Sequence, residues 1–198
     1  MTGDTGSGKT TLANVLLHAR TYTLALRSKA DDSPLPGVRI RRASDFGARA
    51  DINRYLLDPP YEAQLPAFWN AMETVWKQGH WTVYLDELFY LSQLKDKEHR
   101  LNERIERLLT QGRSKHITVV SGMQRPVNVS RYALSQSTHL IAFGAEGRDV
   151  KILDDVAGEA FALAVADLGR YEFAWFYRPT RKVWRGRVQD LLPEHKNP

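Results

Sequence analysis

The chain has 198 residues, of which 42% are apolar and 26% are charged, and its net charge is +5. This length fits one domain, or one domain with a small appendage, and the composition is typical of a folded globular protein. The absence of cysteine excludes a disulfide scaffold, a thiolate zinc site and a cysteine nucleophile. Because no apolar run reaches the roughly 18 to 20 residues of a membrane helix and no signal peptide is recognisable, we expect a cytoplasmic protein without a membrane span.

A glycine-rich segment comes first in the chain and carries its strongest motif. Residues 3–10 read GDTGSGKT and match the phosphate-binding loop pattern G-x-x-x-x-G-K-[ST]. Lys9 would place a positive charge on the outer phosphates, the Thr10 hydroxyl would coordinate Mg²⁺, and Thr11 would reach the α-phosphate. The expected ligands are ATP and Mg²⁺, and the expected nucleotide-binding residues are Gly3, Asp4, Thr5, Gly6, Ser7, Gly8, Lys9, Thr10 and Thr11.

A helix is expected directly after this loop, because apolar residues recur at helical spacing through residues 9–19. Its N-terminus would direct a partial positive charge at bound phosphates, which disfavours the alternative of a glycine-rich turn that matches the pattern by chance. Only Met1 and Thr2 precede the loop, whereas such a loop leaves a buried strand of about five residues. A sheet without that strand would have unpaired edges in its core, so we expect a domain truncated at its N-terminus and lacking its first core strand.

Short apolar segments alternate with amphipathic ones through the rest of the chain. Strands are expected at residues 21–27, 38–42, 81–85, 116–121 and 138–143, with 38–42 at an edge, and a loop at 31–37. Helices are expected at residues 66–78, 98–111, 130–135 and 152–166; residues 51–57 also read as a short helix, and Ser44 as the cap of another. This alternation predicts the α/β class, with a parallel sheet covered on both faces.

The strand expected at 81–85 ends in a pair of acidic residues. Asp86 and Glu87 would lie at the carboxyl edge of the sheet, where ligands bind in open α/β folds. Asp86 would hold Mg²⁺ through water, and Glu87 would orient and deprotonate the attacking water. Acidic residues also begin solvated loops, and it is the upstream loop motif that favours the catalytic interpretation.

Three polar residues around the next strand are further candidates for hydrolysis. Gln124 is placed to contact the γ-phosphate or the water, or else it faces solvent in a turn. Arg113 and Arg125 are candidates for the arginine that a neighbouring subunit often supplies in phosphoryl transfer. Each of the two arginines reads equally well as a surface ion-pair partner.

The tail reads as two strands, 171–177 and 181–188, so we expect a single domain over 1–198 with a C-terminal β-hairpin at 168–190. Aromatic residues alternate along its first strand and arginines along its second. This pattern suits contacts with nucleic acid. The alternation itself, however, favours a packed aromatic face with a basic face in solvent.

Taken in order, the segments GDTGSGKTT, WTVYLDE, QGRSKHITVVSGMQRP and THLIAF resemble the HerA–FtsK group of P-loop ATPases, which includes DNA-pumping and virus genome-packaging motors. The resemblance covers roughly residues 3–143. It implies a three-layer, RecA-like (ASCE) P-loop NTPase core and a homo-oligomeric ring, commonly a hexamer, that acts on DNA. It also implies that Glu87 is the base and Gln124 the polar sensor. Arg113 falls where the family places an arginine that reaches a neighbouring active site.

The expected function is therefore ATP hydrolysis with Mg²⁺ by the motor core of a DNA translocation or packaging ring. Two alternatives remain open at this stage. A small-molecule or nucleoside kinase shares the loop but needs an arginine-rich lid and an acceptor pocket. A nucleotide-dependent assembly subunit that does not hydrolyse ATP is disfavoured only by the intact Glu87.

Overall fold

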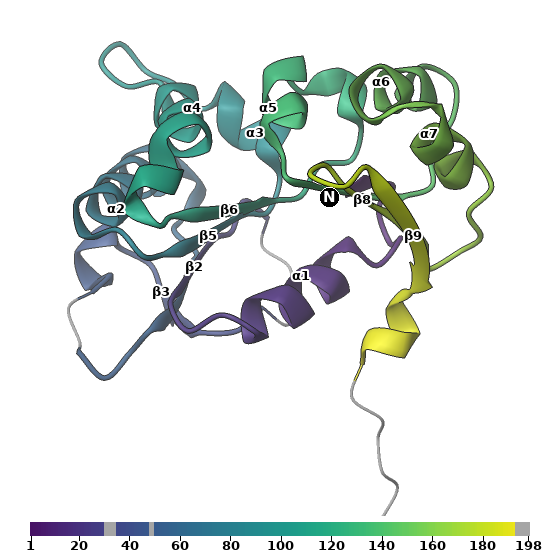
Figure 1. Ribbon diagram of the computed structural model, residues 1–198. Coiled ribbons are helices and arrows are strands. Elements are labelled where there is room, and N and C mark those ends of the chain that lie inside the picture. The colour runs from purple at the N-terminus through teal and green to yellow at the C-terminus, as the bar shows by residue number, and fades with distance from the viewer. Residues whose placement is uncertain (30–34, 48–49, 193–198) are drawn as a thin grey trace, which may run out of the picture. The chain divides into compact units, whose positions relative to one another are not determined.

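The computed structural model describes residues 1–29, 35–47 and 50–192, so most of the loop expected at 31–37 lies outside the described residues (Figure 1). The chain divides into two compact units: Met1–Val15 with Met123–Pro198, and Leu16–Gly122. Helix α1, Lys9–His18, spans the boundary between them in sequence. No helix among the described residues is long and apolar enough to cross a membrane.

The second unit, Leu16–Gly122, is built on a five-stranded sheet in the order β3-β4-β2-β5-β6. All its neighbouring strands are parallel. The central strands β2 and β5 are buried along their whole length, as expected of a parallel sheet covered on both faces. The strands are β2 Thr23–Leu26, β3 Val38–Ile40, β4 Arg54–Leu57, β5 Thr82–Leu85 and β6 Thr118–Ser121.

Strand β4 corrects the prediction of a helix at residues 51–57. It pairs with β2 on one side and β3 on the other, and Tyr55, Leu56 and Leu57 are all buried. A short apolar run that is buried on both faces has no alternation, and periodicity alone does not distinguish it from a buried helical turn. The expected edge position of β3 is confirmed.

Three α-helices accompany this sheet: α2 Gln64–Gln78, α3 Leu88–Gln93 and α4 Leu101–Gln111. Short 3-10 turns lie at Ala43–Asp45, Tyr61–Ala63 and Gly112–Lys115. Ser44 lies inside the first of these turns, whose cap position is Arg42, so the expectation that Ser44 is the cap is wrong. Helix α2 ends where Gly79 adopts a φ of 69° and donates its N–H to the Val75 carbonyl.

The first unit contains a four-stranded sheet in the order β1-β7-β8-β9. Strand β1 is parallel to β7, whereas the β7–β8 and β8–β9 pairs are antiparallel. The expected C-terminal hairpin is therefore formed, and its first strand continues the sheet from β7. The strands are β1 Thr2–Gly3, β7 His139–Phe143, β8 Glu172–Tyr177 and β9 Lys182–Arg187.

The helices of this unit are α5 Arg131–Gln136, α6 Arg148–Ala157 and α7 Glu159–Ala166, with 3-10 turns at Pro126–Asn128 and Val188–Leu191. Residues 152–166 do not form the single helix expected from their sequence. Gly158 has a φ of 94°, ends α6 and immediately precedes α7. Helix α7 packs on the sheet through Phe161, whose ring centroid lies 5.7 Å from that of Phe176 in β8.

The expectation of a missing strand before the glycine-rich loop needs one correction. Thr2 and Gly3 form a short strand that pairs with Ala142 and Phe143. Thr2 also forms a parallel bridge with Met123, and the Gly3 N–H donates to the Gln124 carbonyl at 3.3 Å. The start of the loop is thus hydrogen-bonded on both sides.

Candidate nucleotide-binding site

The glycine-rich loop runs from the end of β1 into the first turn of α1, within the first unit. The Lys9 ammonium donates hydrogen bonds to the carbonyl oxygens of Gly3, at 2.5 Å, and Asp4, at 2.6 Å. The Ser7 N–H donates to the Asp4 carbonyl at 3.2 Å, which closes the loop around this ammonium. The loop therefore concentrates positive charge at the N-terminus of a helix, an arrangement that favours phosphate.

Close packing explains why glycines stand at two positions of this loop. A Cβ atom on Gly3 would lie 2.7 Å from Cβ of Phe143, and one on Gly8 would lie 2.9 Å from Cγ2 of Val188. Both glycines also have positive φ angles, 144° for Gly3 and 107° for Gly8. Any other residue would clash and be strained at these two positions.

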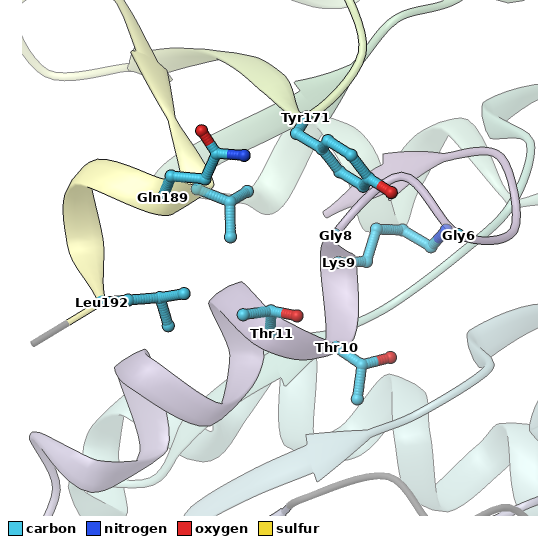
Figure 2. Close-up of a pocket in the computed structure, with 9 residues that line it drawn as sticks. Gly6, Gly8, Lys9, Thr10, Thr11, Tyr171, Gln189 and Leu192 are labelled. Carbon is cyan, nitrogen blue, oxygen red and sulfur yellow. The ribbon is translucent and has the colours of Figure 1, made fainter. Parts of the chain in front are cut away.

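The loop opens into a pocket of about 330 Å³, a volume at the lower end of the range of small-molecule sites (Figure 2). One part of its lining comes from the loop and α1: Gly6, Gly8, Lys9, Thr10 and Thr11. The other part comes from the two ends of the C-terminal hairpin: Tyr171, Val188, Gln189 and Leu192. The site predicted from sequence contains the first group and misses the second.

The pairing of β8 with β9 explains why the hairpin ends reach the loop together. Glu172 pairs with Arg187, so Tyr171 and Val188 lie opposite each other at the open end of the hairpin. The Val188 N–H donates to the Tyr171 carbonyl at 3.0 Å. A hairpin of the two expected strands brings Tyr171 and Val188 next to each other. The sequence does not predict that this end of the hairpin lies against the glycine-rich loop.

The other site residues expected in the first unit are Gln124 and Arg125. The Gln124 carbonyl accepts hydrogen bonds from Gly3 N–H and Thr2 Oγ1, and its side chain is exposed. Arg125 donates through Nε to Oδ2 of Asp149 in α6 at 2.8 Å. Arg125 therefore forms an ion pair, which was the alternative to a catalytic role in the sequence analysis. Gln124 lies beside the start of the loop.

The acidic pair expected to carry catalysis lies in the second unit, after β5. The Tyr84 hydroxyl donates to Oδ1 of Asp86 at 3.1 Å. The Glu87 carboxylate is 13% exposed and lies 3.5 Å from the Lys29 ammonium. Both acidic residues follow the carboxyl end of a parallel strand, as predicted, and each has a polar neighbour that orients it.

Arg113 lies at the other edge of this sheet. It precedes β6, which is parallel to β5, and so belongs to the amino edge, whereas Asp86 and Glu87 follow the carboxyl edge. Its side chain is exposed and makes no hydrogen bond or ion pair within residues 1–29, 35–47 and 50–192. The second unit thus does not bring Arg113 together with Glu87.

The hairpin places its two tryptophans on one face and Arg185 and Arg187 on the other. Trp175 pairs across the strands with Trp184, and their ring centroids are 4.9 Å apart. On the other face, Arg185 contacts Asp167 at 2.8 Å and Arg187 contacts Glu172 at 3.2 Å. These arginines are therefore paired with acidic side chains inside the first unit.

The sequence and the fold were compared with known protein families and solved structures. No protein-family model matches the sequence, and no curated protein matches it. In structure, the chain is similar to the genome packaging NTPase B204 from Sulfolobus turreted icosahedral virus 2 in complex with AMP, with a TM-score of 0.72 and 16% identity over 94% of each chain. The chain has the B204 fold. The expected α/β fold with a parallel sheet is thereby confirmed.

Two further B204 structures agree with this assignment of the fold. The B204 complex with ATP-gammaS gives a TM-score of 0.72 at 16% identity, again over 94% of each chain. B204 from Sulfolobus Turreted Icosahedral Virus, described as a DNA-packaging ATPase, gives a TM-score of 0.68 at 19% identity over 94% of each chain. The likeness to B204 therefore spans both units of this chain.

Proposed function

We propose that this protein binds ATP with Mg²⁺ and hydrolyses it, as the motor core of a ring that translocates or packages DNA. The observation that carries the proposal is the loop whose carbonyl oxygens bind the Lys9 ammonium. This loop opens into a pocket that Lys9 and Thr10 line. We treat both units as one P-loop NTPase domain over 1–198 with a C-terminal hairpin at 168–190. The B204 fold over 94% of the chain supports this view.

Residues of the first unit hold the nucleotide in this proposal. The backbone of residues 4–8 and of the first turn of α1 surrounds the phosphates, because the N-terminus of a helix presents N–H groups and a partial positive charge to an anion. Lys9 neutralises the outer phosphates, Thr10 supplies a hydroxyl ligand to Mg²⁺, and Thr11 contacts the α-phosphate. The metal, when bound, neutralises the charge that develops on the phosphates.

Asp86 and Glu87 carry the proton and metal chemistry in this proposal. Asp86, oriented by the Tyr84 hydroxyl, is the second residue assigned to Mg²⁺, which it would hold through water. Glu87 accepts the proton of the attacking water. Gln124 is assigned as the polar residue that senses the γ-phosphate, and Arg125 is a second candidate, after Arg113, for the arginine that stabilises the transition state.

The DNA-handling role rests on three observations together. B204 is a packaging NTPase by its published description, the chain carries a net charge of +5, and Arg113 is exposed without a partner among the described residues. A free arginine at the amino edge of a sheet suits a finger offered to a neighbouring subunit. We therefore propose a homo-oligomeric ring in which Arg113 acts in trans.

Phosphate release from ATP, measured on the full chain with and without double-stranded DNA, tests this function. We expect Mg²⁺-dependent hydrolysis that DNA stimulates. Lys9→Ala should abolish ATP binding, whereas Glu87→Gln should retain binding and lose turnover, and Glu103→Gln, on the exposed side of α4, is the matched control. Transfer of the γ-phosphate to a nucleoside would identify a kinase instead. Binding without turnover, even with DNA, would identify a non-hydrolysing assembly subunit.

The trans role of Arg113 has its own test. Arg113→Ala and Lys9→Ala subunits should be inactive alone but should complement each other in mixed rings, because an intact loop then meets an intact arginine. Sedimentation velocity establishes that the mixture assembles. Mixed rings without any recovered ATPase activity would refute the assignment.

A further inference from the structure

The part of the pocket contributed by the C-terminal segment has no role in the chemistry described so far. We propose that Val188, Gln189 and Leu192 form a subsite for the nucleobase, and that this subsite selects adenine. This inference rests on the proposed function, because it requires that the loop holds a phosphate chain.

The direction of a phosphate chain on the loop places the nucleoside on this side. Lys9 attracts the outer phosphates and Thr11 the α-phosphate, so the ribose and base lie beyond Thr11. In Figure 2, Leu192 lies on the Thr11 side of the pocket, Gln189 lies on the same short segment across the pocket from Thr11, and Tyr171 lies toward Gly6 and Lys9. The C-terminal segment therefore borders the space that the base must occupy.

The side chains in this space suit a flat aromatic base. Val188 is buried against Gly8, whereas Leu192 is 44% exposed at the pocket wall. A base placed against Leu192 would remove apolar surface of both partners from water. Val188 and Leu192 thus provide apolar contacts that do not depend on which base is bound.

Gln189 supplies the polar group that distinguishes one base from another. Its side chain is exposed and makes no hydrogen bond within the part of the chain that the structure describes. A carboxamide presents a donor beside an acceptor, which matches the N6 amino group and N7 of adenine. Guanine presents two acceptors, O6 and N7, at the same edge and leaves the amide oxygen unpaired.

The backbone holds these side chains on a single short turn. Val188–Leu191 form a 3-10 turn directly after β9, and the Leu192 N–H donates to the Gln189 carbonyl at 3.2 Å. The Val188–Tyr171 hydrogen bond fixes the start of this turn at the open end of the hairpin. Tyr171 itself has a φ of 64°, a strained value for a bulky residue, which indicates that the surrounding structure determines its position.

The test compares three probes that share phosphates and differ in the base: ATP, GTP and inorganic tripolyphosphate, each with Mg²⁺. Their dissociation constants are measured by calorimetry on the full chain and on single variants. Leu192→Ala should weaken ATP binding about five- to tenfold and leave tripolyphosphate binding within twofold. Leu191→Ala is the matched control, because Leu191 is also about 40% exposed but does not line the pocket.

Base selection is tested at Gln189. Gln189→Ala should reduce the preference for ATP over GTP about tenfold, and Gln189→Arg should shift the preference toward GTP, because arginine pairs with O6 and N7 of guanine. Tripolyphosphate binding reports whether each variant retains its loop. Unchanged ATP affinity in Leu192→Ala and an unchanged ATP-to-GTP ratio in both Gln189 variants would overturn the inference.

Failure of the proposed function would look different. In that case the unmodified chain would bind neither ATP nor tripolyphosphate, or Lys9→Ala would leave the binding of both unchanged. Equal losses of ATP and tripolyphosphate affinity in Leu192→Ala would overturn only the inference, since they would show that this residue supports the loop rather than a base.

Discussion

The ammonium of Lys29 lies 3.5 Å from the carboxylate of Glu87, beside the carboxyl edge of the parallel sheet in the second unit. Glu87 is the proposed base, and the contact with the Lys29 ammonium holds its carboxylate in one position. Lys29 is 50% exposed, so the pair contributes up to about 1 kcal/mol.

Lys29→Met should therefore lower kcat for ATP hydrolysis by up to about fivefold, with little change in KM, because Glu87 loses a contact that holds its carboxylate. Steady-state phosphate release measures both constants. Lys77→Met is the control, because Lys77 pairs with Glu73 on α2 and is 73% exposed. An unchanged kcat would instead mean that Glu87 keeps its working position without Lys29.

Gly8→Ala should destabilise the protein by about 1 to 3 kcal/mol more than Gly6→Ala. Both positions have positive φ, but only a Cβ on Gly8 meets a neighbour within 4 Å, at Val188. Urea unfolding measures the difference. If the clash with Val188 causes the additional loss of stability in Gly8→Ala, the double variant Gly8→Ala/Val188→Ala should recover part of it. Equal losses in Gly6→Ala and Gly8→Ala would show that backbone strain alone matters.

Two arginines of α4 contact α2 through cation–π interactions with tryptophan rings and through an ion pair with Glu73. Arg104 lies 4.1 Å above the Trp69 ring and 2.7 Å from the Glu73 carboxylate, while Arg107 lies 3.8 Å above the Trp76 ring. Arg104→Ala should cost about 1 to 2 kcal/mol of unfolding free energy, and Arg104→Lys should recover only part of it, because lysine lacks the planar guanidinium. Denaturant titration of both variants tests this, with full recovery by lysine as the contrary result.

Glu172 makes the stability of the hairpin depend on pH. The Gly169 N–H and the Arg187 guanidinium hold the pKa of this carboxyl below its ordinary value of 4.5. A lowered folded-state pKa stabilises the protein above the ordinary pKa, and this stabilisation is lost as the pH falls through the folded value. The melting temperature of the unmodified chain should therefore exceed that of Glu172→Gln at neutral pH, and the gap should close below pH 4.5. A gap that is constant with pH would contradict this.

Features with a local signature could be predicted from the sequence. The loop at residues 3–10 and the acidic pair after β5 are contiguous motifs, and each appears at the predicted end of its element. The strand β4 could not be distinguished from a helix, because its three buried residues pack on both faces of the sheet and show no period. The break at Gly158 needed knowledge of its φ angle, since a glycine within an apolar stretch also occurs inside helices.

The pocket residues from the C-terminal segment could not be predicted from the sequence, for a different reason. Val188 and Leu192 carry no motif, and their role depends on the register of β8 against β9 and on which strand β8 joins. Both are tertiary choices that are decided by packing against residues far away in the sequence. The pairing of Arg185 and Arg187 with Asp167 and Glu172 was likewise invisible in the alternating pattern of the hairpin.

The pairing of β1 with β7 has a consequence for how the protein is made. Thr2 meets Ala142, which the ribosome adds 140 residues later, and the pocket is lined as far along the chain as Leu192. A nascent chain that has reached Gly122 holds every strand of the parallel sheet in the second unit but none of the partners of its phosphate loop. The residues that line the pocket on the side opposite α1 are therefore synthesised only after the whole parallel sheet of the second unit.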